Sequence, residues 1–146
     1  MQIINKKAQF NYNILDKFEA GIELKGGEVK TIREGYADIS GSHAKFIGNE
    51  LFLINANIPS LNSDANPTRI RKLLLHKGEL LSIGTKIKAK KLTVVPVSLY
   101  TKGRLIKVKL ALAKTKRMFE RKESLKKKDL EREIEKSLSE RYKSKL

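Results

Sequence analysis

The residues of this 146-residue chain best suited to catalysis or metal binding are its two histidines, and neither belongs to a recognised catalytic or metal-binding motif. His43 and His76 do not form an H-x-x-x-H or H-E-x-x-H motif. Such a motif would place two histidines together on one face of a helix. The absence of cysteine excludes disulfide bonds, thiolate zinc sites and thiol catalysis. No G-x-S-x-G element occurs, and Gly26-Gly27 lacks the Lys-Ser/Thr pair of a phosphate-binding loop. We therefore expect a protein that is not an enzyme and that holds no metal and no cofactor.

The excess of positive charge is the strongest signal in the composition. The chain has 32 Lys and Arg against 16 Asp and Glu, a net charge of +16. Such an excess raises self-repulsion in the folded protein, which a polyanionic partner relieves. We interpret it as the footprint of a nucleic acid, with an anionic membrane surface as the minor alternative. No segment resembles a signal peptide or a membrane span, so we expect a cytoplasmic protein with no membrane partner.

Two basic clusters are candidates for binding phosphates. Lys107 and Lys109 lie two residues apart on a predicted strand, which places them side by side on one sheet face. Arg69, Arg71 and Lys72 lie close together on a predicted helix, and the planar guanidinium of arginine matches phosphate geometry. The alternative for this second cluster is a solvated helix face. The aromatic rings of Tyr12 and Tyr100 could stack on bases, although each could equally be half buried in the core.

A predicted hairpin over residues 92–113 positions Lys107 and Lys109. Its first strand is rich in β-branched and aromatic residues, and its second alternates between apolar and polar positions. The apolar face of the second strand consists of Ile106, Val108, Leu110 and Leu112. The turn at Thr101-Lys102-Gly103 fits a short hairpin connection. Pro96 cannot donate to a ladder, so its strand must lie at an edge or carry a bulge there.

The remaining elements predict a single, mainly β domain with short helices. Residues 10–18 are predicted as a strand, 25–33 as a short helix ended by Gly35, and 37–47 with 50–58 as a second hairpin. Residues 57–65 are predicted as a loop. Residues 67–76 are predicted as a helix capped by Asn66, with Ile70, Leu73 and Leu74 towards the core. Gly78 and Gly84 limit the next helix to a short turn over 79–83. The count is five or six strands.

The composition changes after Ala113, which predicts a domain over residues 1–113 and a tail over residues 114–146. The tail holds 13 basic and 7 acidic residues and neither Gly nor Pro. Its apolar residues Leu130, Ile134, Leu138 and Tyr142 recur every four positions. A stripe this narrow is marginal as an isolated helix, so we expect it to become helical on binding a partner. The alternative is a helix packed on its own barrel.

Several motifs, in this order and spacing, resemble the SsrA-binding protein family (small protein B). They are Asn5-Lys-Lys-Ala, the segments Phe18–Arg33 and Asn66–His76, Ser98-Leu-Tyr100, Lys107-Val-Lys109 and Leu112-Ala-Lys114. The resemblance implies an antiparallel β-barrel of the oligonucleotide-binding type. It also implies that the partner is transfer-messenger RNA, bound at its tRNA-like domain, and that the pair rescues stalled ribosomes by trans-translation.

The resemblance also implies roles for individual residues. The RNA-contacting positions of the family match Asn5, Lys6, Glu19, Leu75 and Lys109, with Gly21 supporting the turn. Glu19 is an acceptor, so we expect it to specify the RNA rather than to attract it. With the basic clusters included, the predicted RNA-binding residues are Asn5, Lys6, Glu19, Gly21, Arg69, Arg71, Lys72, Leu75, Lys107, Lys109 and Lys114.

By the same resemblance, the tail acts in the decoding region and messenger channel of the small ribosomal subunit. The residues predicted to act there are Lys116, Arg117, Phe119, Glu120, Arg121 and Lys122. Thr115 and Phe119 depart from the glycine and histidine that are common in the family. We expect a monomer. The alternative functions are a generic ribosome- or rRNA-binding translation factor with the same barrel, and a basic enzyme acting on RNA.

Overall fold

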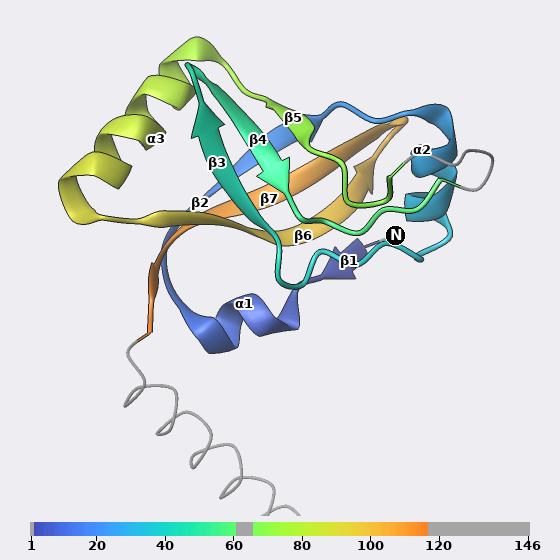
Figure 1. The fold of residues 1–146 in the computed structure, drawn as a ribbon, viewed down its shortest axis with the longest axis horizontal. Helices are drawn as coiled ribbons and strands as arrows, with labels where there is room; N and C mark the ends of the chain where they lie inside the picture. The colour runs from blue at the N-terminus through green and yellow to red at the C-terminus, as the bar shows by residue number, and fades with distance from the viewer. Residues whose placement is uncertain (1, 61–65, 117–146) are drawn as a thin grey trace, which may run out of the picture. The chain divides into compact units, whose positions relative to one another are not determined.

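The strands of this protein close into an antiparallel barrel in the computed structural model, which describes residues 2–60 and 66–116 (Figure 1). The elements in chain order are β1 (Gln2–Ile4), α1 (Lys6–Asn11), β2 (Tyr12–Ile22), α2 (Gly26–Arg33), β3 (His43–Ile47), β4 (Glu50–Ile54), β5 (Arg71–Leu74), α3 (Lys77–Lys90), β6 (Thr93–Lys102) and β7 (Leu105–Thr115). The strand order is β1-β6-β3-β4-β5-β2-β7, and pairing of β6 with β7 closes the ring. The predicted mainly β, barrel-type fold is confirmed.

The hairpin predicted from the sequence is confirmed, since β6 and β7 pair in antiparallel orientation. Gly103 takes a positive φ of 62° in the tight turn, a conformation that favours glycine. The register shifts between Pro96 and Ser98, so the proline lies at a bulge, one of its two expected positions. β7 continues to Thr115, two residues beyond the predicted domain boundary, and the division of the chain at residue 113 stays a prediction.

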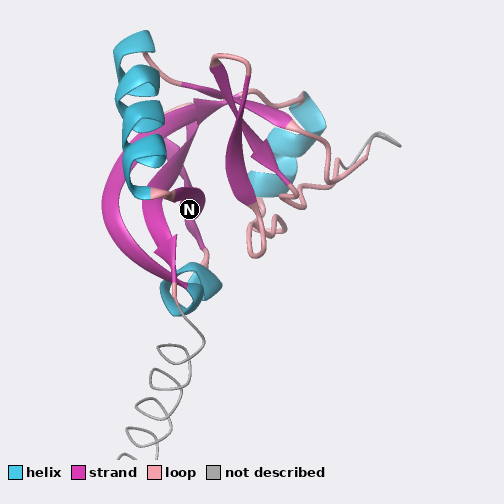
Figure 2. Ribbon diagram, turned by 60° about the vertical axis from the view of Figure 1, so that its left-hand side comes forward, coloured by secondary structure: helices cyan, strands magenta, loops and turns pink. Residues whose placement is uncertain are grey.

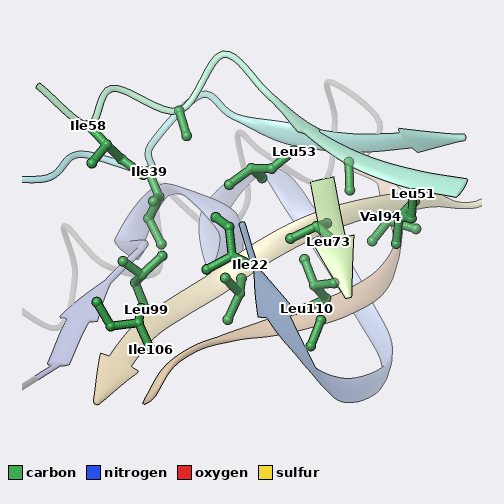
Figure 3. Close-up of a cluster of buried hydrophobic side chains, with 14 of the residues drawn as sticks. Ile22, Ile39, Leu51, Leu53, Ile58, Leu73, Val94, Leu99, Ile106 and Leu110 are labelled. Atoms are coloured by element: carbon green, nitrogen blue, oxygen red, sulfur yellow. The ribbon is translucent and has the colours of Figure 1, made fainter. Parts of the chain in front are cut away.

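The inward faces of the strands form the main hydrophobic core (Figure 3). Leu99, Val108 and Leu110 of the hairpin are fully buried, and they meet Leu51 and Leu53 from β4 inside the barrel. All four predicted core residues of β7 are buried.

A second, smaller cluster lies on the outer face of β6 and β7, where α1 covers the sheet. Ala8 of α1 packs there against Val95, Val97, Ala111 and Ala113. In Figure 2, α1, α2 and α3 lie around the outside of the barrel. Because α1 covers only one part of this face, the part around Glu19 and Lys107 remains open.

Several predicted elements differ from the structure. The described residues form seven strands rather than five or six, and the hairpin predicted over residues 37–47 and 50–58 is confined to His43–Ile47 and Glu50–Ile54. The segment predicted as a strand from residue 10 begins with α1, because Asn5 caps a helix by accepting a hydrogen bond from the Ala8 N–H at 3.3 Å. The strand itself runs on to Ile22. The predicted helix over residues 67–76 is wrong, since residues 71–74 form β5 between β4 and β2. The short turn over residues 79–83 is instead the 14-residue α3, because burial of Ile83 and packing of Leu80 and Ile87 outweigh the two glycines.

A buried ion pair holds the first residue of β5, Arg71, inside the protein. The side chain of Arg71 is fully buried and that of Glu28 is 2% exposed. Arg71 Nε donates to Glu28 Oε2 at 3.0 Å, and its other nitrogens donate to the carbonyl oxygens of Ala56, Ile58 and Pro67, each at 3.0 Å. Burial of a charge is costly unless it is paired and hydrogen-bonded, and these bonds meet that requirement.

Glu28 is the common acceptor of this network. Burial alone would raise the pKa of Glu28, but hydrogen bonds from Arg69, the Lys25 N–H and Arg71 outweigh it and lower the pKa to about 2. The same carboxylate caps the start of α2 through the Lys25 N–H at 2.8 Å. One ionised side chain therefore joins α2 to β5.

We expect Glu28→Gln to lower the free energy of unfolding by about 3–5 kcal/mol, because it leaves the Arg71 charge buried without a counter-charge. Chemical denaturation measures this change. Glu23→Gln, which alters an exposed carboxylate just after β2, is the matched control and should change the stability by less than about 0.5 kcal/mol.

The same pair predicts the acid sensitivity of the fold. Because the folded pKa of Glu28 lies below its ordinary value of 4.5, its contribution is present above pH 4.5 and is lost as the pH falls towards about 2. Glu28→Gln should remove this part of the acid-induced loss. A variant with the stability and acid response of the unchanged protein would contradict the role assigned to the pair.

Candidate nucleic-acid interface

The open part of the outer barrel face carries a cluster that we call the Glu19 surface, consisting of Glu19, Tyr100, Lys102, Lys107 and Lys109. Strand register creates it: Glu19 of β2 lies opposite Lys109 of β7, and Lys107 lies opposite Tyr100 of β6. The bulge after Pro96 places Ser98, Tyr100 and Lys102 on this outer face, while Leu99 remains in the core. Three strands thus present one carboxylate among three lysines.

Glu19 is held by two donors. The Tyr100 hydroxyl donates to Oε2, and Lys102 Nζ donates to Oε1 at 3.3 Å. The pKa of Glu19 is lowered, chiefly by the hydrogen bond from Tyr100, with smaller contributions from Lys102 and Lys107 and with burial acting in the opposite direction. Burial and the bond to Glu19 raise the pKa of Tyr100 to about 12. At neutral pH the carboxylate is therefore an acceptor and the phenol a donor.

Two shallow hollows meet at Glu19. The first, of about 620 Å³, lies towards β5 and the start of α3 and is lined by Phe18, Glu19, Gly21, Leu74, Leu75, His76, Glu79 and Lys107. The second, of about 650 Å³, lies towards β6 and is lined by Gln2, Glu19, Ser98, Tyr100, Thr101, Lys102 and Lys109. Glu19 therefore lines both hollows, with Lys107 in the first and Lys102 and Lys109 in the second.

The floor of the first hollow depends on Gly21. A Cβ added at Gly21 would lie 3.2 Å from Leu74 Cβ, closer than such atoms normally approach. Without a side chain at Gly21, β5 pairs closely with β2, and Leu74 lies over the strand with 47% of its surface exposed. Leu74 thereby contributes an exposed apolar side chain to the hollow that Glu19 also lines.

The structure brings together five of the residues predicted from the sequence. Glu19, Gly21, Leu75, Lys107 and Lys109 all line one or both hollows. Lys107 and Lys109 lie on the outer face, as the alternation of β7 predicts.

Two other predicted residues lie inside the protein. Asn5 is 3% exposed, and its amide donates to the carbonyl oxygens of Ile39 at 3.3 Å and Pro96 at 2.8 Å. Arg71 is enclosed by the Glu28 network. Because their polar groups are used in the fold, we leave Asn5 and Arg71 out of the proposed contact surface.

The remaining predicted residues are spread over other parts of the barrel. Arg69 is bound to Glu28, and Lys72 pairs with Glu50 at 3.0 Å. Lys6 begins α1 and Lys114 lies near the end of β7; both are exposed and outside the two hollows. Of the predicted tail residues, Arg117, Phe119, Glu120, Arg121 and Lys122 lie outside the described residues.

Leu74 and Lys102 belong to the candidate site although no sequence pattern predicted them there, and the role of Tyr100 was open. Leu74 was predicted to face the core because its segment was interpreted as a helix, and this is wrong: in β5 the alternation buries Leu73 and exposes Leu74. The period of a strand applied to Arg71-Lys-Leu-Leu74 would have found it. Lys102 was assigned to the turn, whereas it ends β6.

Within residues 2–60 and 66–116, no cluster of three metal-ligating side chains occurs. No helix in the same part of the chain has the length and apolarity needed to cross a membrane.

Comparisons with known proteins agree on one family. The family model described as SmpB protein matches residues 2–140. An SsrA-binding protein of Sulfurihydrogenibium sp. is 47% identical over 137 residues, covering 91% of this chain and 90% of that protein. One from Malacoplasma penetrans is 43% identical over 140 residues, covering 93% and 96%. Among solved structures, a chain from "tmRNA-SmpB: a journey to the center of the bacterial ribosome" superposes with a TM-score of 0.69 at 41% identity, covering 85% of this chain and 94% of that one.

The different positions of Leu74 and Leu75 predict different effects of truncation. Leu75 packs against the main core, so Leu75→Ala should destabilise the protein by about 2 kcal/mol. Leu74→Ala removes an exposed side chain and should cost less than about 1 kcal/mol, while weakening RNA binding at the first hollow. Thermal unfolding and RNA titration measure the two effects. Equal losses of stability in both variants would contradict the assignment of Leu74 to the surface.

Proposed function

The chain belongs to the SmpB protein family, and we propose that it is an RNA-binding adaptor that carries transfer-messenger RNA to stalled ribosomes for trans-translation. The observation that carries this proposal is the Glu19 surface, where lysines for phosphates and an oriented acceptor for a base or ribose share one open face. The structural neighbour from the complex of transfer-messenger RNA, SmpB and the ribosome supports both partners.

The chemistry of the Glu19 surface suits a folded RNA. Lys107 and Lys109 supply positive charge for phosphates, which position an RNA without reading its sequence. Glu19 repels phosphates and accepts hydrogen bonds from bases and 2′-hydroxyls, so it selects among RNAs. We propose that the ligand at this surface is the tRNA-like domain of transfer-messenger RNA.

The tail is proposed to act on the ribosome rather than on this RNA. Its sequence places Lys116, Arg117, Arg121 and Lys122 around Phe119, a combination of cations and an aromatic ring that suits ribosomal RNA. The proposal assigns this cluster to the decoding region of the small subunit. We also propose that this adaptor carries out no reaction of its own and that it acts in the cytoplasm as a monomer.

Lys107→Ala should weaken binding of the tRNA-like RNA several-fold, and it should weaken binding of unrelated structured RNA by a similar factor. Removal of one phosphate contact should also reduce the slope of log K against log salt by about 1. Filter binding at several salt concentrations measures both quantities. Lys30→Ala, which removes an exposed lysine of α2, is the control with the same change in net charge. If the two variants behaved alike, the Glu19 surface would not be the binding face.

Truncation after Lys116 should separate RNA binding from ribosome rescue. The cut leaves every described strand intact, so the shortened protein should fold and bind the tRNA-like RNA within a few-fold of the full chain. It should fail to support peptide tagging in a purified translation system with stalled ribosomes. Normal tagging by the truncated protein, or complete loss of RNA binding, would contradict the proposed division of roles. A generic rRNA-binding factor would show no preference for the tRNA-like RNA in the same titrations.

A further inference from the structure

We infer that the Glu19 carboxylate reads the Watson–Crick edge of an unpaired guanine, and that Tyr100 is the residue that positions it. The inference rests on the proposed function, because it names the chemical group recognised at the same surface. It adds a base identity and a second residue required for specificity.

Acceptor positions remain on both carboxylate oxygens of Glu19. An ionised carboxylate has about four lone-pair positions on its two oxygens. Tyr100 uses one on Oε2, and Lys102 uses one on Oε1 at 3.3 Å. The Lys102 side chain is 67% exposed and that of Glu19 is 36% exposed. Each oxygen of Glu19 can therefore accept one further hydrogen bond from a ligand.

The four bases differ in the arrangement of donors and acceptors on their Watson–Crick edges. A carboxylate that offers two adjacent acceptors requires two adjacent donors, and it is repelled by an acceptor in either place. Guanine presents N1–H beside its N2 amino group. Adenine and cytosine present an amino group beside a ring nitrogen that accepts, and uracil presents N3–H between two carbonyl oxygens. Guanine is therefore the one standard base that satisfies both oxygens of Glu19 together.

The first hollow provides space for a base beside the Glu19 carboxylate. The first hollow begins at Glu19, and the half-exposed side chain of Leu74 gives it an apolar surface among polar lining residues. Unstacked RNA bases are bound by such surfaces, which cover the face of the base while polar groups read its edge. Lys107 on the rim of the hollow is placed for the phosphate of the same nucleotide.

Tyr100 fixes the direction in which Glu19 accepts. Its hydroxyl holds Oε2, whereas the flexible, exposed Lys102 holds Oε1 only loosely. The charged groups facing Glu19 are Lys102, Lys107 and Lys109, and His76 and Glu79 line the same hollow. Without the hydroxyl, the lysines would draw the carboxylate to other rotamers, and the paired geometry that guanine requires would be lost.

Inosine substitution tests the identity of the base, because inosine lacks only the N2 amino group of guanosine. The tRNA-like RNA is transcribed with a low fraction of inosine, partitioned by binding to the full-length protein, and the inosine positions in the two fractions are compared. The unchanged protein should disfavour inosine about 10-fold at one guanosine position. Glu19→Gln should remove the effect at that position, whereas Glu23→Gln should retain it. No inosine effect in the unchanged protein, or the same effect in Glu19→Gln, would overturn the inference.

Tyr100→Phe tests the positioning role, with Tyr36→Phe as the control at an exposed tyrosine outside the surface. Tyr100→Phe keeps the ring and should leave the melting temperature almost unchanged, while reducing the guanosine preference to less than 3-fold. The pKa of Glu19 should rise when its main hydrogen bond is removed. Acidification should abolish the guanosine preference when Glu19 becomes protonated. In Tyr100→Phe this loss, measured between about pH 4 and 7, should therefore occur at a higher pH than in the unchanged protein. An unchanged preference and pH profile would show that the hydroxyl serves only the fold.

Preference for the tRNA-like RNA tests the proposed function, and it is measured separately from the inosine effect and from the effect of Tyr100→Phe. If the protein prefers the tRNA-like RNA but is indifferent to inosine, the function stands and the guanine inference fails. If the protein shows no preference for that RNA, the proposed function fails first.

Discussion

The buried ion pair between Arg71 and Glu28 is the interaction on which the rest of the barrel depends. One guanidinium joins the start of α2, the segment after β4 and the segment before β5. Two charges leave water to form it, and the loss of hydration is compensated only if every donor finds an acceptor. The pair therefore favours a single arrangement of these segments, which apolar packing alone would specify less sharply.

This arrangement also determines where the proposed binding surface lies. Side chains of a strand alternate between two faces, so an inward Arg71 requires an inward Leu73 and an outward Leu74. The outward Leu74 then meets the bare backbone at Gly21, next to Glu19. A buried charged group thus determines which leucine lies on the proposed binding surface, and a change of register by one residue would remove both features together.

The sequence was informative where one periodicity was visible and misleading where two were possible. The long alternation from Ile106 to Leu112 fits only a strand, and it placed Lys107 and Lys109 correctly. The four residues of β5 are too few to show alternation, and their apolar positions fit a helix equally well. The bond between Tyr100 and Glu19 joins residues 81 positions apart, which no local pattern contains. Local patterns therefore predicted the outward position of the lysines of the proposed site, whereas the orientation of its carboxylate depends on tertiary structure.

The pairing of β2 with β7 has a consequence for how the protein folds. Tyr12 at the start of β2 lies opposite Thr115 at the end of β7, so these strands come from opposite ends of the barrel sequence. Such pairing must close a long loop before any contact compensates for the entropy lost, and this slows folding compared with helical proteins. During synthesis, β2 leaves the ribosome long before its partner exists. The exposed edge of β2 is thus open to mispairing with other chains until β7 emerges.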